Sequence, residues 1–321
     1  MNLNYPEILK DTLYREKMPE ILNKLGEIRK VTHLETNGGA LYCESYITEN
    51  ADKNVIILHG FTEFCAKYRE MIWYLLNLNC NVFTYDQRGH GFSHRQVDDL
   101  RLVHIDSFST YVSDLDEVIN KLVKPLGNGL PIYIFSHSMG GAVASLYMME
   151  HPNDITKAAL CAPMISPQTM NVPRPLVLMM TRHHGKKFGW DKRFAYAGDF
   201  DPAVDIRNTL DESKARFEAT MKLRIATKEY QSSAATNGWM WEAVTVQDKI
   251  LKPKKLKKIN TQVLILSAQR DTVVKNKYQF RFAKKLKNSK VITVPCAKHN
   301  IFFSSDNTLS GFYKLLFDFF S

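Results

Sequence analysis

Short apolar runs alternate along the chain with longer segments in which apolar residues recur at helical spacing, from about residue 54 onward. A short apolar run is typical of a buried strand, and helical spacing between two such runs is typical of a crossover helix. The alternation therefore predicts a mostly parallel central sheet flanked by helices on both faces. The predicted strands are 54–58, 80–85, 131–135, 155–161, 262–266 and 290–294, and the predicted helices are 68–78, 108–122, 141–150, 278–286 and 311–320.

The segment before residue 54 has a different pattern. Two strand-like runs, 31–36 and 40–47, flank Asn37-Gly38-Gly39, which is a hairpin signal and predicts antiparallel edge strands. Residues 1–30 form a predicted helical extension, in which Pro6 and Pro19 each precede Glu-Ile-Leu and would each open a short helix. We expect this extension to lie as a strap over the core, with an interfacial anchor as the alternative.

The stretch 164–251 interrupts the alternation because it has no strand-like runs and its pattern indicates helices and loops. An insertion of this length between two strands predicts a helical cap, inserted after the sixth strand of the sheet. The core domain is then expected to comprise 31–163 and 252–321, with the cap at 164–251 between its two parts.

Composition narrows the class of protein. Hydrophobic residues make up 45% and charged residues 24% of 321 residues, which excludes a disordered chain, a collagen-like repeat and a coiled coil. No apolar stretch approaches the roughly 20 residues of a membrane helix, and the polar first ten residues lack a signal-peptide core. Five cysteines without a C-x-x-C pair argue against a disulfide framework or a metal site. We therefore expect a cytoplasmic protein that binds no metal.

The net charge of +10 comes from one stretch. Residues 249–290 hold the Lys-rich part of the chain, and between Asp248 and Lys290 there are 14 basic residues against two acidic ones. A solvated surface is one interpretation, and peripheral contact with an anionic membrane, at its inner face, is the other. No nucleic-acid partner is expected, because no aromatic or Gly-rich recognition motif accompanies the lysines.

A candidate nucleophile lies between a predicted strand and a predicted helix, in Ser136-His137-Ser138-Met139-Gly140-Gly141. A strand, sharp turn and helix place Ser138 at the apex of the turn, next to the positive end of the helix. A serine hydroxyl needs a base, which is in turn oriented by an acid. Asp271 and His299 each follow a predicted strand and occur in the order that this arrangement requires.

The oxyanion of a tetrahedral intermediate needs N–H donors that are already in position. Met139 follows the candidate nucleophile directly, and Phe61 lies in the loop after the first buried strand. Their backbone N–H groups are the candidate donors.

At this point the sequence resembles the α/β-hydrolase superfamily, and within it the monoacylglycerol lipase and lysophospholipase branch, also grouped as serine aminopeptidase-like hydrolases. The resemblance implies the α/β-hydrolase fold, Ser138 as nucleophile, Asp271 as acid, His299 as base, and no cofactor. The sequence departs from the usual pattern of this family at Ser136, where a glycine is common. The matching motifs are HGFTE (59–63), YDQRGHGFS (85–93), SHSMGG (136–141), LCAPM (160–164), RDTVV (270–274) and AKHNIF (297–302).

The resemblance also implies the substrate class, which is an ester of a single-chain lipid such as a lysophospholipid or a monoacylglycerol. The cap would then hold the acyl chain, and we expect Leu176, Met179, Met180 and Trp239 to line that pocket, unless they form the core of the cap itself. The alternatives are an esterase for small or aromatic-acid esters and, from another class of protein, a non-catalytic ligand receptor on the same fold.

Overall fold

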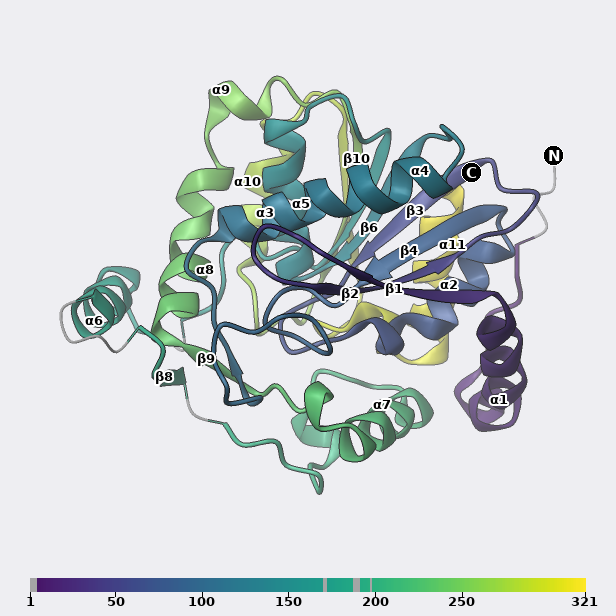
Figure 1. The fold of residues 1–321 in the computed structure, drawn as a ribbon, viewed down its shortest axis with the longest axis horizontal. Coiled ribbons are helices and arrows are strands. Elements are labelled where there is room, and N and C mark those ends of the chain that lie inside the picture. Colours follow the sequence, from purple (N-terminus) through teal and green to yellow (C-terminus); the bar gives the residue numbers. More distant parts are fainter. Residues whose placement is uncertain (1–4, 170–171, 187–190, 197) are drawn as a thin grey trace.

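The computed structural model describes residues 5–169, 172–186, 191–196 and 198–321. Its centre is an eight-stranded sheet in the order β1-β2-β4-β3-β6-β7-β10-β11 (Figure 1). The strand β2 runs antiparallel to both neighbours, and all other pairs are parallel, which confirms the predicted sheet and its N-terminal hairpin. The strands are β1 (Arg29–Leu34), β2 (Leu41–Tyr46), β3 (Lys53–Leu58), β4 (Cys80–Tyr85), β6 (Ile132–His137), β7 (Lys157–Cys161), β10 (Gln262–Ala268) and β11 (Ser289–Val294).

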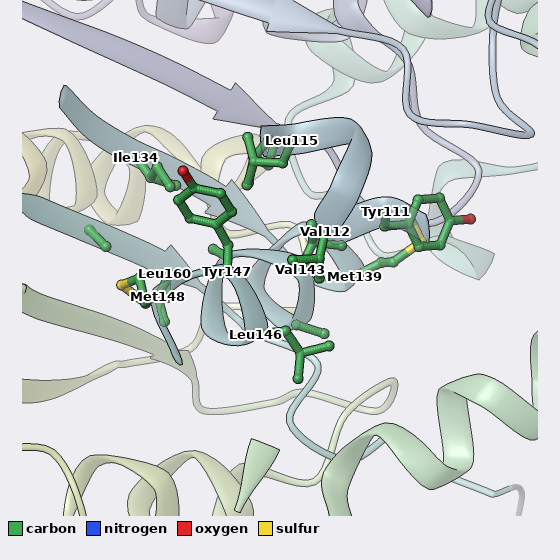
Figure 2. Close-up of a cluster of buried hydrophobic side chains, with 14 of the residues drawn as sticks. Tyr111, Val112, Leu115, Ile134, Met139, Val143, Leu146, Tyr147, Met148 and Leu160 are labelled. Carbon is green, nitrogen blue, oxygen red and sulfur yellow. The ribbon is translucent and has the colours of Figure 1, made fainter. Parts of the chain in front are cut away.

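Helices cover both faces of this sheet, as the alternating pattern predicts. Along β3, Val55 and Ile57 point into one apolar layer, while Ile56 and Leu58 point into the other. The first layer packs under α2 and α11 and the second under α3, α5 and α10; Figure 2 shows the second layer around α5. The helices are α1 (Asp11–Ile28), α2 (Arg69–Leu76), α3 (Phe108–Val118), α4 (Lys124–Leu126), α5 (Met139–Glu150), α6 (Arg174–Lys186), α7 (Lys214–Ala226), α8 (Asn237–Ile250), α9 (Pro253–Leu256), α10 (Asn276–Ala283) and α11 (Asp306–Phe320).

The N-terminal segment forms one helix, α1, where two short ones were expected. Pro19 lies inside α1 and does not open a second helix, so this prediction was wrong. An interior proline costs about 3 kcal/mol. The helix nevertheless continues because one face is buried along its whole length, and each buried apolar side chain contributes about 1.5–3 kcal/mol. The buried residues of that face are Tyr14, Met18, Ile21 and Leu25. Neither α1 nor any other helix in the described ranges is both long and apolar enough to cross a lipid bilayer.

The insertion follows β7, which is the sixth strand of the main sheet, and ends before β10. It contains α6, α7, α8 and α9. The expectation that it has no strands was wrong: β8 (Phe194–Tyr196) and β9 (Ala234–Thr236) form a small sheet with β5 (Leu102–Val103) in the order β5-β9-β8. Strands of two or three residues are too short for their alternation to be visible in the sequence.

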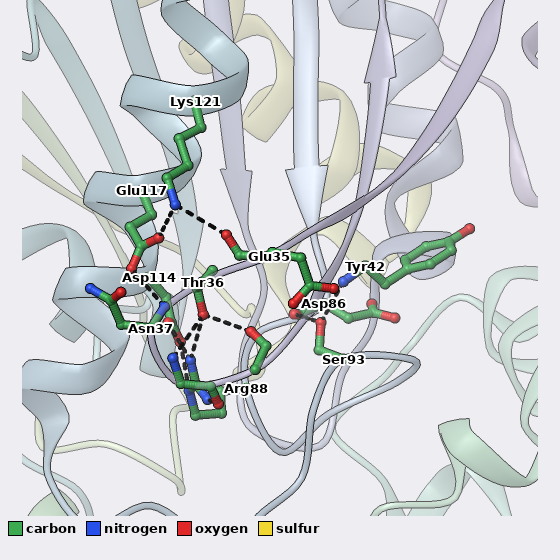
Figure 3. A network of polar contacts seen from close by, with 12 residues as sticks. Glu35, Thr36, Asn37, Tyr42, Asp86, Arg88, Ser93, Asp114, Glu117 and Lys121 are labelled. Atoms are coloured by element: carbon green, nitrogen blue, oxygen red, sulfur yellow. Dashed lines mark hydrogen bonds and ion pairs between the residues drawn. The ribbon is translucent and has the colours of Figure 1, made fainter.

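A buried polar network holds the hairpin turn against the rest of the core (Figure 3). The Arg88 guanidinium donates to both carboxylate oxygens of Asp114, at 2.9 and 2.6 Å, and to Thr36 Oγ1 at 3.1 Å. It also donates to the carbonyl oxygen of Gly38. Arg88, which forms a two-pronged pair with the Asp114 carboxylate, therefore joins the β1–β2 turn, the loop after β4 and α3. This network stabilises the scaffold that carries the site.

Candidate active site

Ser138 lies at a sharp turn between β6 and α5. Its φ of 50° and ψ of −112° are unfavourable for a residue with a side chain, so the surrounding contacts must hold it there. Its N–H donates to the Cys161 carbonyl at 3.0 Å, and its own carbonyl accepts from Met164 at 2.8 Å. A Cβ atom at Gly140 would lie 2.3 Å from the Leu58 carbonyl oxygen, so only glycine fits there. The turn presents the Ser138 hydroxyl at the carboxyl edge of the sheet.

Asp271 and His299 meet at the same edge, each after its own strand. His299 Nδ1–H donates to Asp271 Oδ2 at 2.7 Å. The other carboxylate oxygen accepts from the backbone N–H groups of Val273 and Val274, at 2.8 and 2.9 Å. Burial raises the pKa of Asp271, but the hydrogen bonds from His299 and from the two N–H groups outweigh it and hold the pKa below its ordinary value. The carboxylate is thus ionised and fixed, and it keeps the proton of the imidazole on Nδ1.

One cavity of about 310 Å³ contains both Ser138 and His299 in its wall. With Asp271 bonded to His299, the structure brings together the three residues that the sequence placed in this order. The Nε2 atom of His299 remains the ring nitrogen that is available as a base.

The two candidate oxyanion donors come from different elements. Met139 is the first residue of α5, so its N–H has no carbonyl acceptor within the helix. Phe61 lies in the loop after β3, and its N–H has no backbone acceptor among the described residues. Both residues are therefore placed with N–H groups that a ligand can use.

His59 holds the loop that carries Phe61. Its Nε2 accepts from the Gln87 N–H at 2.8 Å, which fixes the proton on Nδ1, and Nδ1–H then donates to the Gly60 carbonyl at 2.7 Å. The ring is fully buried, and burial lowers its pKa. His59 is a neutral, structural histidine.

Glu63 connects this loop to the nucleophile turn, a role that the sequence analysis did not assign. Its carboxylate accepts from the Gly60 N–H at 2.5 Å, Tyr68 Oη–H at 2.6 Å, Lys67 Nζ at 2.6 Å and His137 Nδ1–H at 3.1 Å. The other ring nitrogen of His137 lies 3.3 Å from the carbonyl oxygen of His299. Glu63 and His137 thus link three segments: the loop after β3, which carries Phe61 (the oxyanion loop), the turn at Ser138 (the nucleophile turn) and the loop that carries His299.

The roof of the cavity comes from the inserted segment. Phe217, Thr220, Met221 and Arg224 of α7 line the cavity, together with Asp211 from the loop before that helix. Asp211 and Arg224 were not candidates in the sequence analysis. The spacing 217, 220, 221 and 224 is that of one helix face, and an arginine on a face with no other charged residue was the signal that could have identified Arg224.

The residues expected to line an acyl pocket lie elsewhere. Leu176, Met179 and Met180 are exposed on α6, which projects away from the main sheet in Figure 1, and they are not among the described residues that line the cavity. Trp239 of α8 is buried with its ring centre 4.0 Å from that of Phe61. It therefore packs behind the oxyanion loop, and the structure does not place it in the cavity wall.

His104, Asp106 and Asp191 are the one group of three potential metal ligands in the described part of the chain, with ligand atoms within 4.8 Å of one another. The two ring nitrogens of His104 already lie 2.8 Å from Thr236 Oγ1 and 3.2 Å from Asp106 Oδ1. The group joins the loop after β5 to β9, apart from the catalytic cavity. That the protein uses no metal or cofactor stays a prediction.

Comparison with known proteins assigns the chain to a family. Residues 49–306 match the family model described as serine aminopeptidase, S33. Lysophospholipase L2 of Escherichia coli K12 is 27% identical over 289 residues, which cover 85% of this chain and 82% of that protein. Human monoglyceride lipase is 30% identical over 133 residues, covering 41% of this chain and 42% of that protein.

Solved structures agree on the fold. A soluble variant of monoglyceride lipase from Saccharomyces cerevisiae, in complex with a substrate analog, superposes with a TM-score of 0.72 at 17% identity and covers 91% of this chain and 94% of its own. A thermostable carboxyl esterase from Bacillus coagulans gives a TM-score of 0.69 at 15% identity, with 91% and 97% coverage. Since the family match spans most of the chain, the protein belongs to the serine aminopeptidase S33 family and is a hydrolase with the α/β-hydrolase fold.

Proposed function

We propose that this enzyme releases fatty acid from esters of single-chain lipids by transferring the acyl group to Ser138. The observation that carries the proposal is the 2.7 Å hydrogen bond between Asp271 and His299, beside a serine held in a strained turn of the same cavity. The relatives named lysophospholipase and monoglyceride lipase support a lipid ester as the substrate.

The reaction would proceed in two steps. Ser138 Oγ attacks the ester carbonyl carbon while His299 Nε2 takes the hydroxyl proton, and Asp271 stabilises the imidazolium that forms. His299 then protonates the leaving alcohol, and the acyl group stays on Ser138. Water repeats the sequence, with its proton going to His299, and releases the fatty acid.

The oxyanion that forms in each step would be held by the N–H groups of Phe61 and Met139. Each such donor contributes about 3–4 kcal/mol to the stability of the transition state in comparable enzymes. The hydrogen bonds of His59 and Glu63 to Gly60 keep the first of these donors in place, so no reorganisation is needed during the reaction.

The acyl chain would leave the catalytic cavity along α7. An apolar groove of about 440 Å³ shares Val204, Phe217 and Met221 with that cavity and extends to Pro202 and Ile225. Each methylene buried there would contribute about 0.8 kcal/mol. This groove replaces Leu176, Met179 and Met180 as the proposed acyl site.

Hydrolysis of small esters is the second candidate, and the modest volume of the catalytic cavity favours it, since about 310 Å³ accommodates a short acyl group without the groove. The two candidates differ in their dependence on chain length. A lipid hydrolase gains in kcat/KM from acetyl to oleoyl esters, whereas a small-ester esterase does not.

The test is fatty-acid release from 1-oleoyl lysophosphatidylcholine and 1-oleoylglycerol, with p-nitrophenyl acetate as the small ester. We expect release from at least one lipid, and a loss of at least 10⁴-fold in kcat for Ser138→Ala. Cleavage of p-nitrophenyl acetate alone would support the small-ester esterase. Failure of a fluorophosphonate probe to label Ser138 in the folded protein would support a non-catalytic receptor.

A further inference from the structure

Arg224 occupies a position where an apolar residue would be expected. Its neighbours on the inner face of α7 are Phe217, Thr220 and Met221, and all of them line the catalytic cavity. Placing a guanidinium on this face costs desolvation energy, because burial disfavours the charged form. A side chain with a cost of this kind is expected to have a partner of opposite charge.

The structure provides no such partner within the described residues. Arg224 Nε–H donates to the Tyr230 carbonyl at 3.0 Å and Nη2–H to the Ser232 carbonyl at 2.9 Å, and no carboxylate forms an ion pair with it. Burial lowers the pKa of Arg224 to about 10, against the opposing effect of the carboxylates of Asp211 and Glu63. The group is therefore a cation at neutral pH whose charge has not been neutralised.

The guanidinium is also held in one orientation. The two hydrogen bonds to backbone carbonyl oxygens fix the edge of the guanidinium formed by Nε and Nη2. The centre of the Phe200 ring lies 4.6 Å from the central guanidinium carbon. Nη1 makes no hydrogen bond with a described residue, and the Arg224 side chain lines the cavity. A planar fork of N–H donors that is already oriented is well suited to a phosphate group.

Asp211 lies in the wall of the same cavity and carries the opposite charge. Its Oδ1 accepts from Asn300 Nδ2 at 2.6 Å, and no cationic side chain of the described residues forms an ion pair with it. The other carboxylate in the cavity wall, Glu63, is already paired with Lys67 and bonded to His137. The cavity therefore presents one cation and one anion, neither of which forms an ion pair with a described residue.

The backbone that carries this pair is anchored to the core. Arg216, two turns before Arg224 on α7, donates to both carboxylate oxygens of Glu70, at 2.8 and 2.5 Å. Ser213 caps the start of α7. The distance between Arg224 and the catalytic loops is thus set by a rigid connection.

We propose that Arg224 and Asp211 form a head-group subsite for a zwitterionic lysophospholipid, in which Arg224 binds the phosphate and Asp211 faces the ammonium group. This inference rests on the proposed function and names the substrate within it. A monoacylglycerol carries neither charge, so it would leave both residues without a partner.

The experiment compares kcat/KM for three oleoyl substrates in mixed micelles of fixed composition: lysophosphatidylcholine, lysophosphatidic acid and 1-oleoylglycerol. We expect Arg224→Gln to lower kcat/KM for both phosphate-containing lipids by about 10- to 100-fold, the range for a hydrogen bond to a charged group, and to change that for 1-oleoylglycerol less than threefold. Asp211→Asn should lower kcat/KM for lysophosphatidylcholine alone. Arg224→Lys should restore part of the activity, because it keeps the charge and loses the fork.

Arg207→Gln is the matched control, because it removes the same charge from an exposed position of the inserted segment. An equal loss on all three substrates in Arg224→Gln would make Arg224 a structural residue and overturn the proposal. So would a wild-type enzyme that cleaves 1-oleoylglycerol and neither lysophospholipid, and in that case the proposed function would still stand. Release that persists in Ser138→Ala would instead contradict the proposed function itself.

Discussion

Glu63 joins three loops of the active site through one buried carboxylate. Its four donors come from the oxyanion loop, from the turn that follows it and from the residue before the nucleophile. Burial alone would raise the pKa of Glu63, but His137 and Lys67 outweigh it and hold the pKa well below its ordinary value of 4.5. The carboxylate is therefore ionised at every pH at which the enzyme is expected to work.

We predict that Glu63→Gln lowers the free energy of unfolding by about 3 kcal/mol near pH 7, because it leaves Lys67 buried without its counter-charge. A carboxyl group whose pKa is lower in the folded state stabilises that state at pH values above its pKa in the unfolded state. The difference from wild type should thus be complete above pH 4.5 and shrink as the pH falls below it. Urea unfolding at several pH values measures this.

The same variant should lower kcat about tenfold, because Gly60, which precedes Phe61, then donates to a neutral amide oxygen in place of a carboxylate, and Phe61 is held less firmly. Glu49→Gln is the control, since Glu49 is exposed. A difference in unfolding free energy that stays constant from pH 7 to below pH 4.5 would contradict the assignment of this charge.

Among the secondary-structure elements, α7 is joined to α2 of the core by a buried ion pair. Arg216 of α7 is fully buried against Glu70 of α2, and its guanidinium also donates to the Leu9 carbonyl at 2.7 Å. Burial lowers the pKa of Arg216, but the attraction of Glu70 raises it by more. The pair connects the N-terminal segment, the core and the roof of the cavity.

We expect Glu70→Ala to lower the free energy of unfolding by about 3–5 kcal/mol, because it leaves Arg216 charged in the interior with only the carboxylate of Asp11, 3.9 Å away, as a counter-charge among the described residues. Glu218→Ala, which removes a half-exposed carboxylate of α7, should change it by less than about 1 kcal/mol. Denaturant titration of both variants is the measurement. Equal losses would mean that burial of the pair has no energetic consequence.

How far the sequence predicts the structure depends on the length of each element. The buried run at 80–85 forms a strand with those bounds, and Ser138, Asp271 and His299, the candidate catalytic residues, lie at one sheet edge as their order predicted. The hydrophobic pattern did not reveal β8 or β9, each three residues long. It also could not show that Met179 and Met180 face outward, because periodicity identifies an apolar face but not what covers it.

For the molecule as a whole, the lysines around α9 and the cavity that contains Ser138 lie at opposite ends of the sheet. The lysines between β7 and β10 flank α9, directly before β10 begins, whereas the candidate catalytic residues follow the strands. Figure 1 shows α9 and α7 at opposite ends. Within the described residues none of these lysines forms an ion pair, and all are exposed; they are Lys252, Lys254, Lys255, Lys257 and Lys258.

We propose that these lysines attract an anionic membrane surface. Replacing all five by glutamine should weaken co-sedimentation with phosphatidylserine-containing vesicles at least tenfold at low salt, since each lysine near such a surface contributes about 1 kcal/mol. Hydrolysis of a dispersed p-nitrophenyl ester should not change, because the cavity is distant. Unchanged vesicle binding would mean that these five lysines form a solvated surface that does not bind membranes.

The anchoring of α7 has a consequence for how the enzyme meets aggregated substrate. A lipase whose lid swings open at an interface shows an abrupt rise in rate at the critical micelle concentration of its substrate. Here the roof, α7, could swing open only if Arg216 left its buried contact with Glu70. Breaking this buried ion pair would cost free energy. Its rate should therefore rise smoothly through that concentration, as for an enzyme that takes up lipid monomers one at a time.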